Sequence, residues 1–302
     1  MKEILLITGG TGMVGSAIRG GIKISSKDVD LKDFNETLKW FKRIKPTHVI
    51  HTAGRVGGLG GNMKYMGEFF YDNVAMNTNV LEASRLVGVK KIVSFLSTCI
   101  FPDEIEYPLT EEKLYLGPPH DSNFGYAYAK RMLDVQARAY NQQYDINCIS
   151  IIPANIYGPG DNFDLESGHV LPSLIHKCYL AKKNNTDFKI WGSGTPLRQF
   201  NYSQDIADLS LWALEHYDDK SPIIFTDSRE VSIKDIAYLI AKYLNFNGNI
   251  IFESDKPDGQ YRKPASNSKL LSYLPDFEFT ELEFGLKNTI DWFLANYPNV
   301  RK

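Results

Sequence analysis

The sequence predicts an α/β protein, in which a Rossmann-type doubly wound parallel sheet carries a smaller C-terminal α/β substrate lobe. Two observations favour this class. Short apolar runs alternate with helical patterns through the first half of the 302 residues, as in a parallel sheet. A glycine-rich stretch from Gly9 to Gly15 directly follows the first apolar run, where a dinucleotide-binding fold places its phosphate loop.

The individual elements follow from the residue pattern. Short apolar runs predict strands at residues 4–8, 22–25, 48–51, 92–96 and 148–152. Longer patterns predict helices at residues 73–86, 126–144 and 169–183. In the second of these helices, Leu133, Ala137, Tyr140 and Tyr144 recur at helical spacing and predict one apolar face.

The pattern becomes less regular after residue 153, which predicts a second unit. Turn residues occur at 158–161 and a hinge-like loop at 192–196. Ser232 and Asp235 form a capping box that opens an apolar-striped helix. We expect a dinucleotide-binding domain from residues 1–153 plus roughly 199–226, and a lobe from 154–198 plus 227–302, with ligands in the cleft between them.

Composition excludes several classes of protein. Lys plus Arg number 34 and Asp plus Glu 36, a net charge of −2, whereas a dedicated nucleic-acid binder carries a basic excess. The three cysteines cannot all pair within the chain, so we expect reduced thiols and a cytoplasmic protein. No apolar run reaches the ~18 residues of a membrane span. No pair of histidines has a convincing metal-ligand context, so we expect no metal. From the net charge and the short apolar runs, we expect neither a nucleic-acid nor a membrane partner.

The glycine stretch predicts a dinucleotide site. Glycines at 9, 12 and 15 allow a tight turn and a close approach of the backbone to a pyrophosphate. The residues expected to contact the cofactor here are Gly9, Gly10, Thr11, Gly12, Met13, Val14 and Gly15.

The segment after the loop is unusually short. Six residues separate Gly15 from Ile22, whereas a crossover with its helix needs a dozen or more. The first helix is therefore short, or the second strand is displaced. No acid stands at the tip of that strand to select NAD, and nearby hydroxyls and Lys27 favour the 2′-phosphate of NADP, although Lys27 on a solvated turn is an alternative. The cofactor residues expected here are Ser26, Lys27, Asp30 and Leu31.

A Tyr-x-x-x-Lys motif opens the helix predicted at 126–144. Tyr126 and Lys130 share a helix face, and the nearby ammonium is expected to lower the pKa of the phenol from its usual value of about 10. Ser97 ends the strand predicted at 92–96, where its hydroxyl can bind a substrate carbonyl. The glycine loop, the serine and the Tyr–Lys pair together form a constellation that is far more specific than any one of them alone.

With these motifs, the sequence resembles the extended short-chain dehydrogenase/reductase family, and the resemblance covers almost the whole chain. A narrower likeness is carried by residues 97–102, 117–120, 123–126, 161–163, 168–172, 192–200 and 256–259. It implies the bifunctional enzymes that perform 3,5-epimerisation and NADPH-dependent 4-reduction of GDP-4-keto-6-deoxy-D-mannose to GDP-L-fucose. It also implies a homodimer, with the helix at 126–144 in the interface.

The resemblance assigns roles to individual residues. The implied catalytic residues are Ser97, Cys99, Tyr126, Lys130 and His169. Further implied cofactor contacts are Ser97, Tyr126, Lys130, Pro153, Asn155, Ile156 and His169. The implied GDP-sugar contacts are Ser97, Cys99, Asn155, Lys177, Trp191, Arg198 and Asp258.

The chemistry of the side chains agrees with these roles. Inversion at C3 or C5 beside a ketone needs a base on one face and an acid on the other. A thiol and an imidazole, here Cys99 and His169, have pKa values that bracket neutral pH. Tyr126 and Ser97 can donate to the charge that develops on O4.

Other readings of the sequence remain open. Cys99 alone resembles a small buried hydrophobe, His169 a helix cap, Trp191 a core residue and Arg198 a surface charge. The whole chain is also compatible with a nucleotide-sugar epimerase that retains its NAD(P) without net reduction, or with a non-catalytic NADP-binding module.

Overall fold

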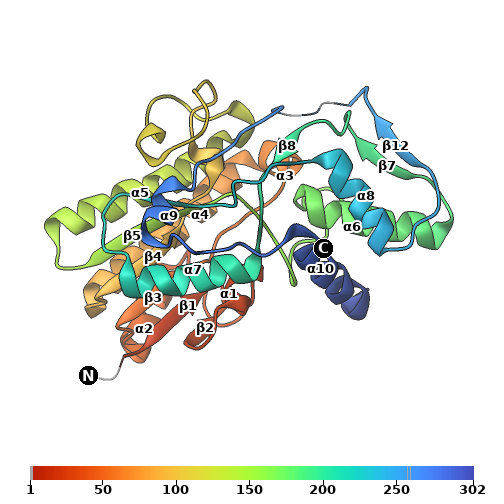
Figure 1. Cartoon of the computed structure of the whole chain (residues 1–302). Coiled ribbons are helices and arrows are strands. Elements are labelled where there is room, and N and C mark those ends of the chain that lie inside the picture. The colour runs from red at the N-terminus through yellow and green to blue at the C-terminus, as the bar shows by residue number, and fades with distance from the viewer. Residues whose placement is uncertain (1–2, 257, 259) are drawn as a thin grey trace.

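The computed structural model describes residues 3–256, 258 and 260–302 and confirms the α/β class. Its centre is a six-stranded parallel sheet with strand order β10-β5-β4-β3-β1-β2 (Figure 1). The strands are β1 Leu5–Thr8, β2 Ile22–Ile24, β3 His48–His51, β4 Lys91–Phe95, β5 Asn147–Pro153 and β10 Ile223–Phe225. Five of these six match the predicted strands to within one residue at each end.

Successive residues of the buried strands enter two different cores, because side chains alternate across a sheet. Leu6 packs in a core with α2 (Phe34–Ile44), α4 (Met66–Val87) and α5 (Phe124–Gln143). Ile7 packs in the opposite core with α1 (Met13–Ala17), α7 (Ser203–His216) and α9 (Ser268–Tyr273). Helices on both faces explain why five of the six strands are almost entirely buried, with β2 as the exposed edge, and they confirm the doubly wound fold.

The short connection after the glycine loop is accommodated by a short helix. α1 has only five residues, and β2 still pairs with β1 in parallel. The helix predicted at 73–86 is wrong at its start, because α4 already begins at Met66. Gly67 obscured this turn in the sequence, whereas the buried Phe69 anchors it in the structure.

The C-terminal lobe has a core of its own. The helices α6 (Val170–Asn184), α8 (Ile233–Tyr243) and α10 (Leu282–Asn296) pack with β7 (Phe188–Trp191), which pairs with β12 (Ile250–Glu253). Ser232 caps α8 by accepting a hydrogen bond from the Asp235 amide at 3.0 Å, as predicted. In Figure 1 this lobe lies to the right of the sheet.

Short elements connect the two parts. β6 (Asn155–Tyr157) pairs with β9 (Phe200–Tyr202), and β8 (Leu197–Arg198) pairs with β11 (Val231–Ser232). The remaining elements are α3 Leu59–Lys64, η1 Thr98–Ile100, η2 Glu111–Lys113 and η3 Asp121–Asn123. Within the described residues, every helix is too short or too polar to cross a membrane.

The segment 260–279 crosses back to the central sheet. The Leu109 amide donates to the Pro264 carbonyl at 2.8 Å, and the Ala265 amide donates to Gln199 Oε1 at 2.8 Å. Leu270 of α9 is buried in the core that α7 covers. The predicted division at residues 153, 199 and 226 stays a prediction, but this segment, which it assigns to the lobe, packs on the sheet.

Candidate active site

The glycine loop lies at the switch point of the sheet. β1 has β2 on one side and β3 on the other, and ligands of such sheets bind at the carboxyl ends of these strands. Gly9 has a φ of +68°, and a Cβ there would lie 2.8 Å from Ala53 Cα. A Cβ on Gly15 would collide with the Gly9 carbonyl, whereas the space around Gly12 is open apart from that carbonyl. The loop therefore forms the cradle that a pyrophosphate requires.

The other residues predicted around the loop differ in exposure. Thr11, Ser26, Lys27 and Asp30 are exposed, and Met13 is half-buried. Val14 and Leu31 are buried in the two cores of the sheet, so their side chains support the site rather than face it. Asp28, the acid nearest the tip of β2, accepts hydrogen bonds from the Ser25 amide at 2.9 Å and hydroxyl at 2.8 Å. This turn leaves Lys27 exposed beside the strand end.

A buried polar chain that the sequence analysis missed lies beneath the loop. Thr8 Oγ1 is 2.7 Å from His51 Nδ1, and His51 Nε2 is 3.0 Å from Asn77 Oδ1. Burial lowers the pKa of His51 to about 3, and the Lys130 charge adds to this effect. The neutral ring therefore ties β1 to β3 and α4. Thr8 and His51 are the last residues of two neighbouring strands, and this position in the sequence could have predicted their contact.

The Tyr–Lys pair is buried at the carboxyl end of β4. Lys130 Nζ donates to the Phe95 carbonyl at 2.7 Å and lies 5.8 Å from the centre of the Tyr126 ring. Burial lowers the pKa of Lys130 to about 8. The predicted lowering of the Tyr126 pKa is wrong for this structure, because burial and the nearby charge of Cys99 both raise that pKa. At neutral pH, Tyr126 is therefore a protonated donor.

Cys99 lies on η1 and Ser97 caps that helix, beside this pair. The Cys99 amide donates to Ser97 Oγ at 3.4 Å. Burial raises the pKa of the Cys99 thiol, while the charges of Lys263 and Lys130 lower it. Lys263 belongs to the returning segment 260–279, and the sequence analysis missed it because no motif marks it. The charges of Cys99, Tyr126 and Lys130 influence one another, so the structure brings these three predicted residues together.

His169 lies at the N-terminus of α6, as its cap residue. Its Nδ1 is buried without a hydrogen-bond partner among the described residues. Burial and the charge of Arg301 lower the pKa of His169. Asp161, on the preceding loop, also feels the charge of Arg301, and burial raises its pKa to about 7. In the part of the chain described, no hydrogen bond joins His169 to Cys99 or Tyr126.

Three further predicted residues lie on the connection between sheet and lobe. Pro153 is buried at the end of β5 and Ile156 packs against the core beneath α7. Asn155 is exposed, and its Nδ2 donates to the Gln199 carbonyl at 2.9 Å. Of the three, Asn155 therefore has the freest side chain to meet a ligand.

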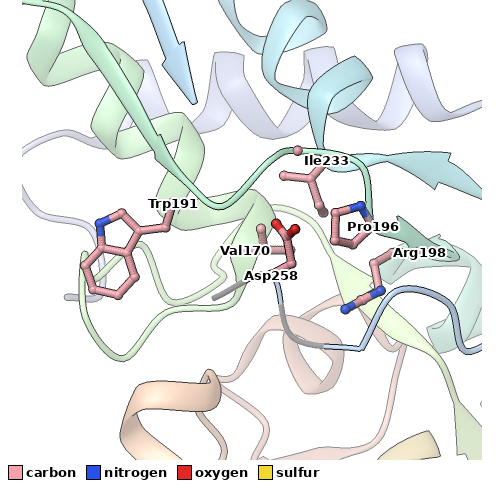
Figure 2. Close-up of a pocket in the computed structure, with 7 residues that line it drawn as sticks. Val170, Trp191, Pro196, Arg198, Ile233 and Asp258 are labelled. Carbon is pink, nitrogen blue, oxygen red and sulfur yellow. The ribbon is translucent and has the colours of Figure 1, made fainter. Parts of the chain in front are cut away.

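A cavity of about 150 Å³ in the lobe collects three of the predicted GDP-sugar contacts. Figure 2 shows Trp191 at one end of it, Arg198 at the other and Asp258 between them. Arg198 is half-buried and donates to the carbonyls of Leu197 at 2.7 Å and Gln260 at 2.8 Å, so it is not a surface charge. Trp191 is 66 % exposed and is not a core residue.

Lys177, another of the predicted GDP-sugar contacts, lies on the far side of the indole. Lys177 Nζ is 5.0 Å from the centre of the Trp191 ring. Asp258 accepts hydrogen bonds from the Ser193 amide at 2.6 Å and hydroxyl at 2.8 Å, which holds the loop after β7. The motif predicted at 256–259 also contains Pro257 and Gly259, which lie outside the described residues.

A switch-point glycine loop, a buried Tyr–Lys pair and a separate ligand cavity define a dinucleotide-dependent enzyme of the short-chain dehydrogenase/reductase class. Comparison with known proteins agrees, since residues 5–226 match the NAD dependent epimerase/dehydratase family. The chain belongs to this family and, within it, to the GDP-L-fucose synthases.

Full-length relatives support the narrower placement. GDP-L-fucose synthase of Dictyostelium discoideum is 50 % identical, over 100 % of this chain and 98 % of its own. A probable GDP-L-fucose synthase of Drosophila melanogaster is 45 % identical over 100 % of both chains. The crystal structure of a GDP-L-fucose synthetase from Naegleria fowleri bound to NADP matches with a TM-score of 0.95 and 47 % identity, over 100 % of this chain and 95 % of that one.

Proposed function

We propose that this protein converts GDP-4-keto-6-deoxy-D-mannose to GDP-L-fucose, by epimerisation at C3 and C5 followed by reduction of C4 with NADPH. The observation that carries the proposal is the cluster of Cys99, Tyr126 and Lys130 at the carboxyl end of β4, the same edge of the sheet as the glycine loop. In this cluster, the thiol that we assign to acid–base chemistry lies next to the residues that we expect to serve a ketone reduction.

The cofactor has a fitting site among the residues present. The glycine loop would hold the pyrophosphate, Ser26 and Lys27 the 2′-phosphate, and Lys130 a ribose hydroxyl. When bound, NADPH supplies the hydride for C4. The other cofactor contacts that we propose are Asp30, Leu31, Pro153, Asn155, Ile156 and His169.

The epimerisation half uses the acidity of hydrogens that flank a ketone. We assign Cys99 and His169 as the base and acid on opposite faces of the sugar ring, with the proton leaving C3 or C5 for one and returning from the other. Tyr126 and Ser97 donate hydrogen bonds to O4 as negative charge develops there. Burial raises the pKa of the Cys99 thiol, and the Lys263 and Lys130 charges offset part of that rise. Cys99 is therefore a protonated thiol that can supply the returning proton, and loss of that proton gives the thiolate that accepts one.

The reduction half uses the same donors. Tyr126 stays protonated at neutral pH because burial raises its pKa, so it can give its proton to O4 as hydride reaches C4. Lys130, fixed on the Phe95 carbonyl, remains largely charged at neutral pH with a pKa of about 8. One ketone and one donor set thus serve both half-reactions.

The test combines a nicotinamide assay with product analysis. We expect the purified protein to oxidise NADPH when supplied with GDP-4-keto-6-deoxy-D-mannose, and NMR to identify GDP-L-fucose. Deuterium uptake at C3 or C5 without loss of NADPH would instead support an epimerase that retains its cofactor. A folded protein that binds NADP and shows neither signal would support the non-catalytic module.

We also propose that the protein is a cytoplasmic homodimer that pairs through α4 and α5. These adjacent helices expose large apolar side chains, among them Tyr71 at 66 % and Val135 at 54 % exposure, with Phe124 and Met132 also exposed. Light scattering should give twice the chain mass, and Val135→Glu should give a monomer. A wild-type monomer, or a membrane-bound fraction in cells, would contradict this proposal.

A further inference from the structure

A second, open groove of about 350 Å³ lies beyond the indole of Trp191. Trp191 lines both this groove and the cavity that contains Arg198 and Asp258. A nucleotide whose diphosphate lies at Arg198 can therefore extend its base over Trp191 into the groove. Among the charged residues that line the groove, Lys177 is a predicted contact, whereas neither the sequence motifs nor the proposed mechanism uses Glu253, Lys189 or Asp187.

Strand pairing fixes Glu253 beside the indole. β7 and β12 are parallel, and their register sets Glu253 opposite Trp191. The Gly192 amide donates to the Glu253 carbonyl at 3.0 Å, which holds this register at the strand end. In β7, Phe188 and Ile190 are buried while Lys189 and Trp191 are exposed, so the outward face of this two-stranded sheet carries the indole.

The Glu253 carboxylate is available for a ligand. Within residues 3–256, 258 and 260–302, its side chain has neither a hydrogen-bond nor an ion-pair partner. Lys177 and Glu253 attract each other, and the Lys177 ammonium lies 5.0 Å from the centre of the Trp191 ring. The groove therefore combines an aromatic surface for stacking with a carboxylate acceptor at its edge.

This combination discriminates among nucleobases. A carboxylate is an acceptor with two oxygens and binds best to two parallel donors. Guanine presents such a pair on one edge, its N1–H and its N2 amino group. Adenine presents the N1 lone pair at the corresponding position, and uracil flanks its single N–H with two carbonyl oxygens, which a carboxylate repels.

We propose that Glu253 selects guanine, by accepting hydrogen bonds from N1–H and the N2 amino group of a base stacked on Trp191. Glu253 is then the residue that makes the site specific for GDP-linked sugars. The inference rests on the proposed function and deepens it, because it explains which nucleotide the lobe accepts.

The test measures the affinities of GDP, IDP and ADP by calorimetry on the NADP-loaded protein. IDP lacks only the N2 amino group, so wild type should bind it about tenfold more weakly than GDP, and ADP more weakly still. In Glu253→Gln, the affinity for GDP should fall at least tenfold, and the ratio of the GDP affinity to the IDP affinity should fall toward one. Asp187→Asn, which changes another acid of the same groove, should keep the wild-type ratio.

The outcomes separate this inference from the proposed function. If Glu253→Gln binds NADP normally and keeps the GDP-to-IDP ratio, Glu253 does not select the base and the inference is wrong. Equal affinity of wild type for GDP and ADP would also overturn it. If the wild type oxidises NADPH with the GDP-linked keto sugar but Glu253→Gln has unchanged affinities for GDP and IDP, only the inference fails. A wild type that binds no GDP contradicts the proposed function itself.

Discussion

The part of the site on the sheet, where we expect NADPH, and the part in the lobe, where we expect the GDP-sugar, are built from different kinds of residues. On the sheet, Thr8, His51 and Lys130 are buried and joined to other elements by hydrogen bonds. In the lobe, Trp191 is two-thirds exposed on a two-stranded sheet and Asp258 lies on an exposed loop. Changes in the first half should therefore alter stability or chemistry, whereas changes in the second should alter ligand affinity alone.

The largest effect is expected at Cys99, on the sheet side of the cleft. Cys99→Ser should slow solvent exchange at C3 and C5 by about a hundredfold or more, because a serine hydroxyl is a much weaker acid–base group. NADPH affinity should stay unchanged, and Cys178→Ala, in the core of the lobe, should keep the exchange rate. Normal exchange in Cys99→Ser would remove the thiol from the mechanism.

His51 tests whether the buried half controls stability. Its pKa is about 3 in the folded protein against an ordinary 6.5, so between these pH values the unfolded state binds a proton that the folded state does not. The free energy of unfolding should fall by about 1.4 kcal/mol for each pH unit lost in this window. Urea unfolding of wild type and His51→Gln between pH 6.5 and 5 measures the difference, and equal slopes would contradict the argument.

Trp191 tests the opposite half. Trp191→Ala should weaken GDP binding about tenfold through lost base stacking, with NADPH affinity and melting temperature unchanged because the side chain is 66 % exposed. Calorimetry and thermal unfolding provide both readouts. A clear drop in melting temperature would show that the indole is structural and would weaken the contrast between the halves.

Lys263 is the point where the two halves meet, and its effect should be the smallest. Its charge favours the Cys99 thiolate, so Lys263→Met should raise the pKa of the thiol and slow its alkylation by iodoacetamide several-fold at pH 8. Lys263→Arg should stay near the wild-type rate. An unchanged alkylation profile in Lys263→Met would show that the two side chains act independently.

The same contrast explains what could be predicted from the sequence. The glycine loop, the sheet, the Tyr126–Lys130 pair and the Ser232 cap are local patterns, because periodicity and turn chemistry are written in neighbouring residues. The lobe contacts at Trp191, Arg198 and Asp258 came from family resemblance, since no local rule marks an exposed indole as a ligand site.

What the sequence could not reveal depends on packing between distant segments. Lys263 reaches Cys99 only because residues 260–279 return to the sheet. Glu253 faces Trp191 only through the register of β12 with β7. The Tyr126 pKa was predicted in the wrong direction because the spacing of Tyr126 and Lys130 gives their proximity but not the burial that outweighs it.

The most direct test of one ketone site serving two half-reactions is Tyr126→Phe, assayed in deuterium oxide with GDP-4-keto-6-deoxy-D-mannose and NADPH. We predict NADPH oxidation below about 1 % of wild type, because the proton donor to O4 is lost. Deuterium exchange at C3 and C5 should persist within about tenfold, because Cys99, His169 and Ser97 remain. Oxidation of NADPH at the wild-type rate would contradict the account. So would a variant that loses both the deuterium exchange and the reduction.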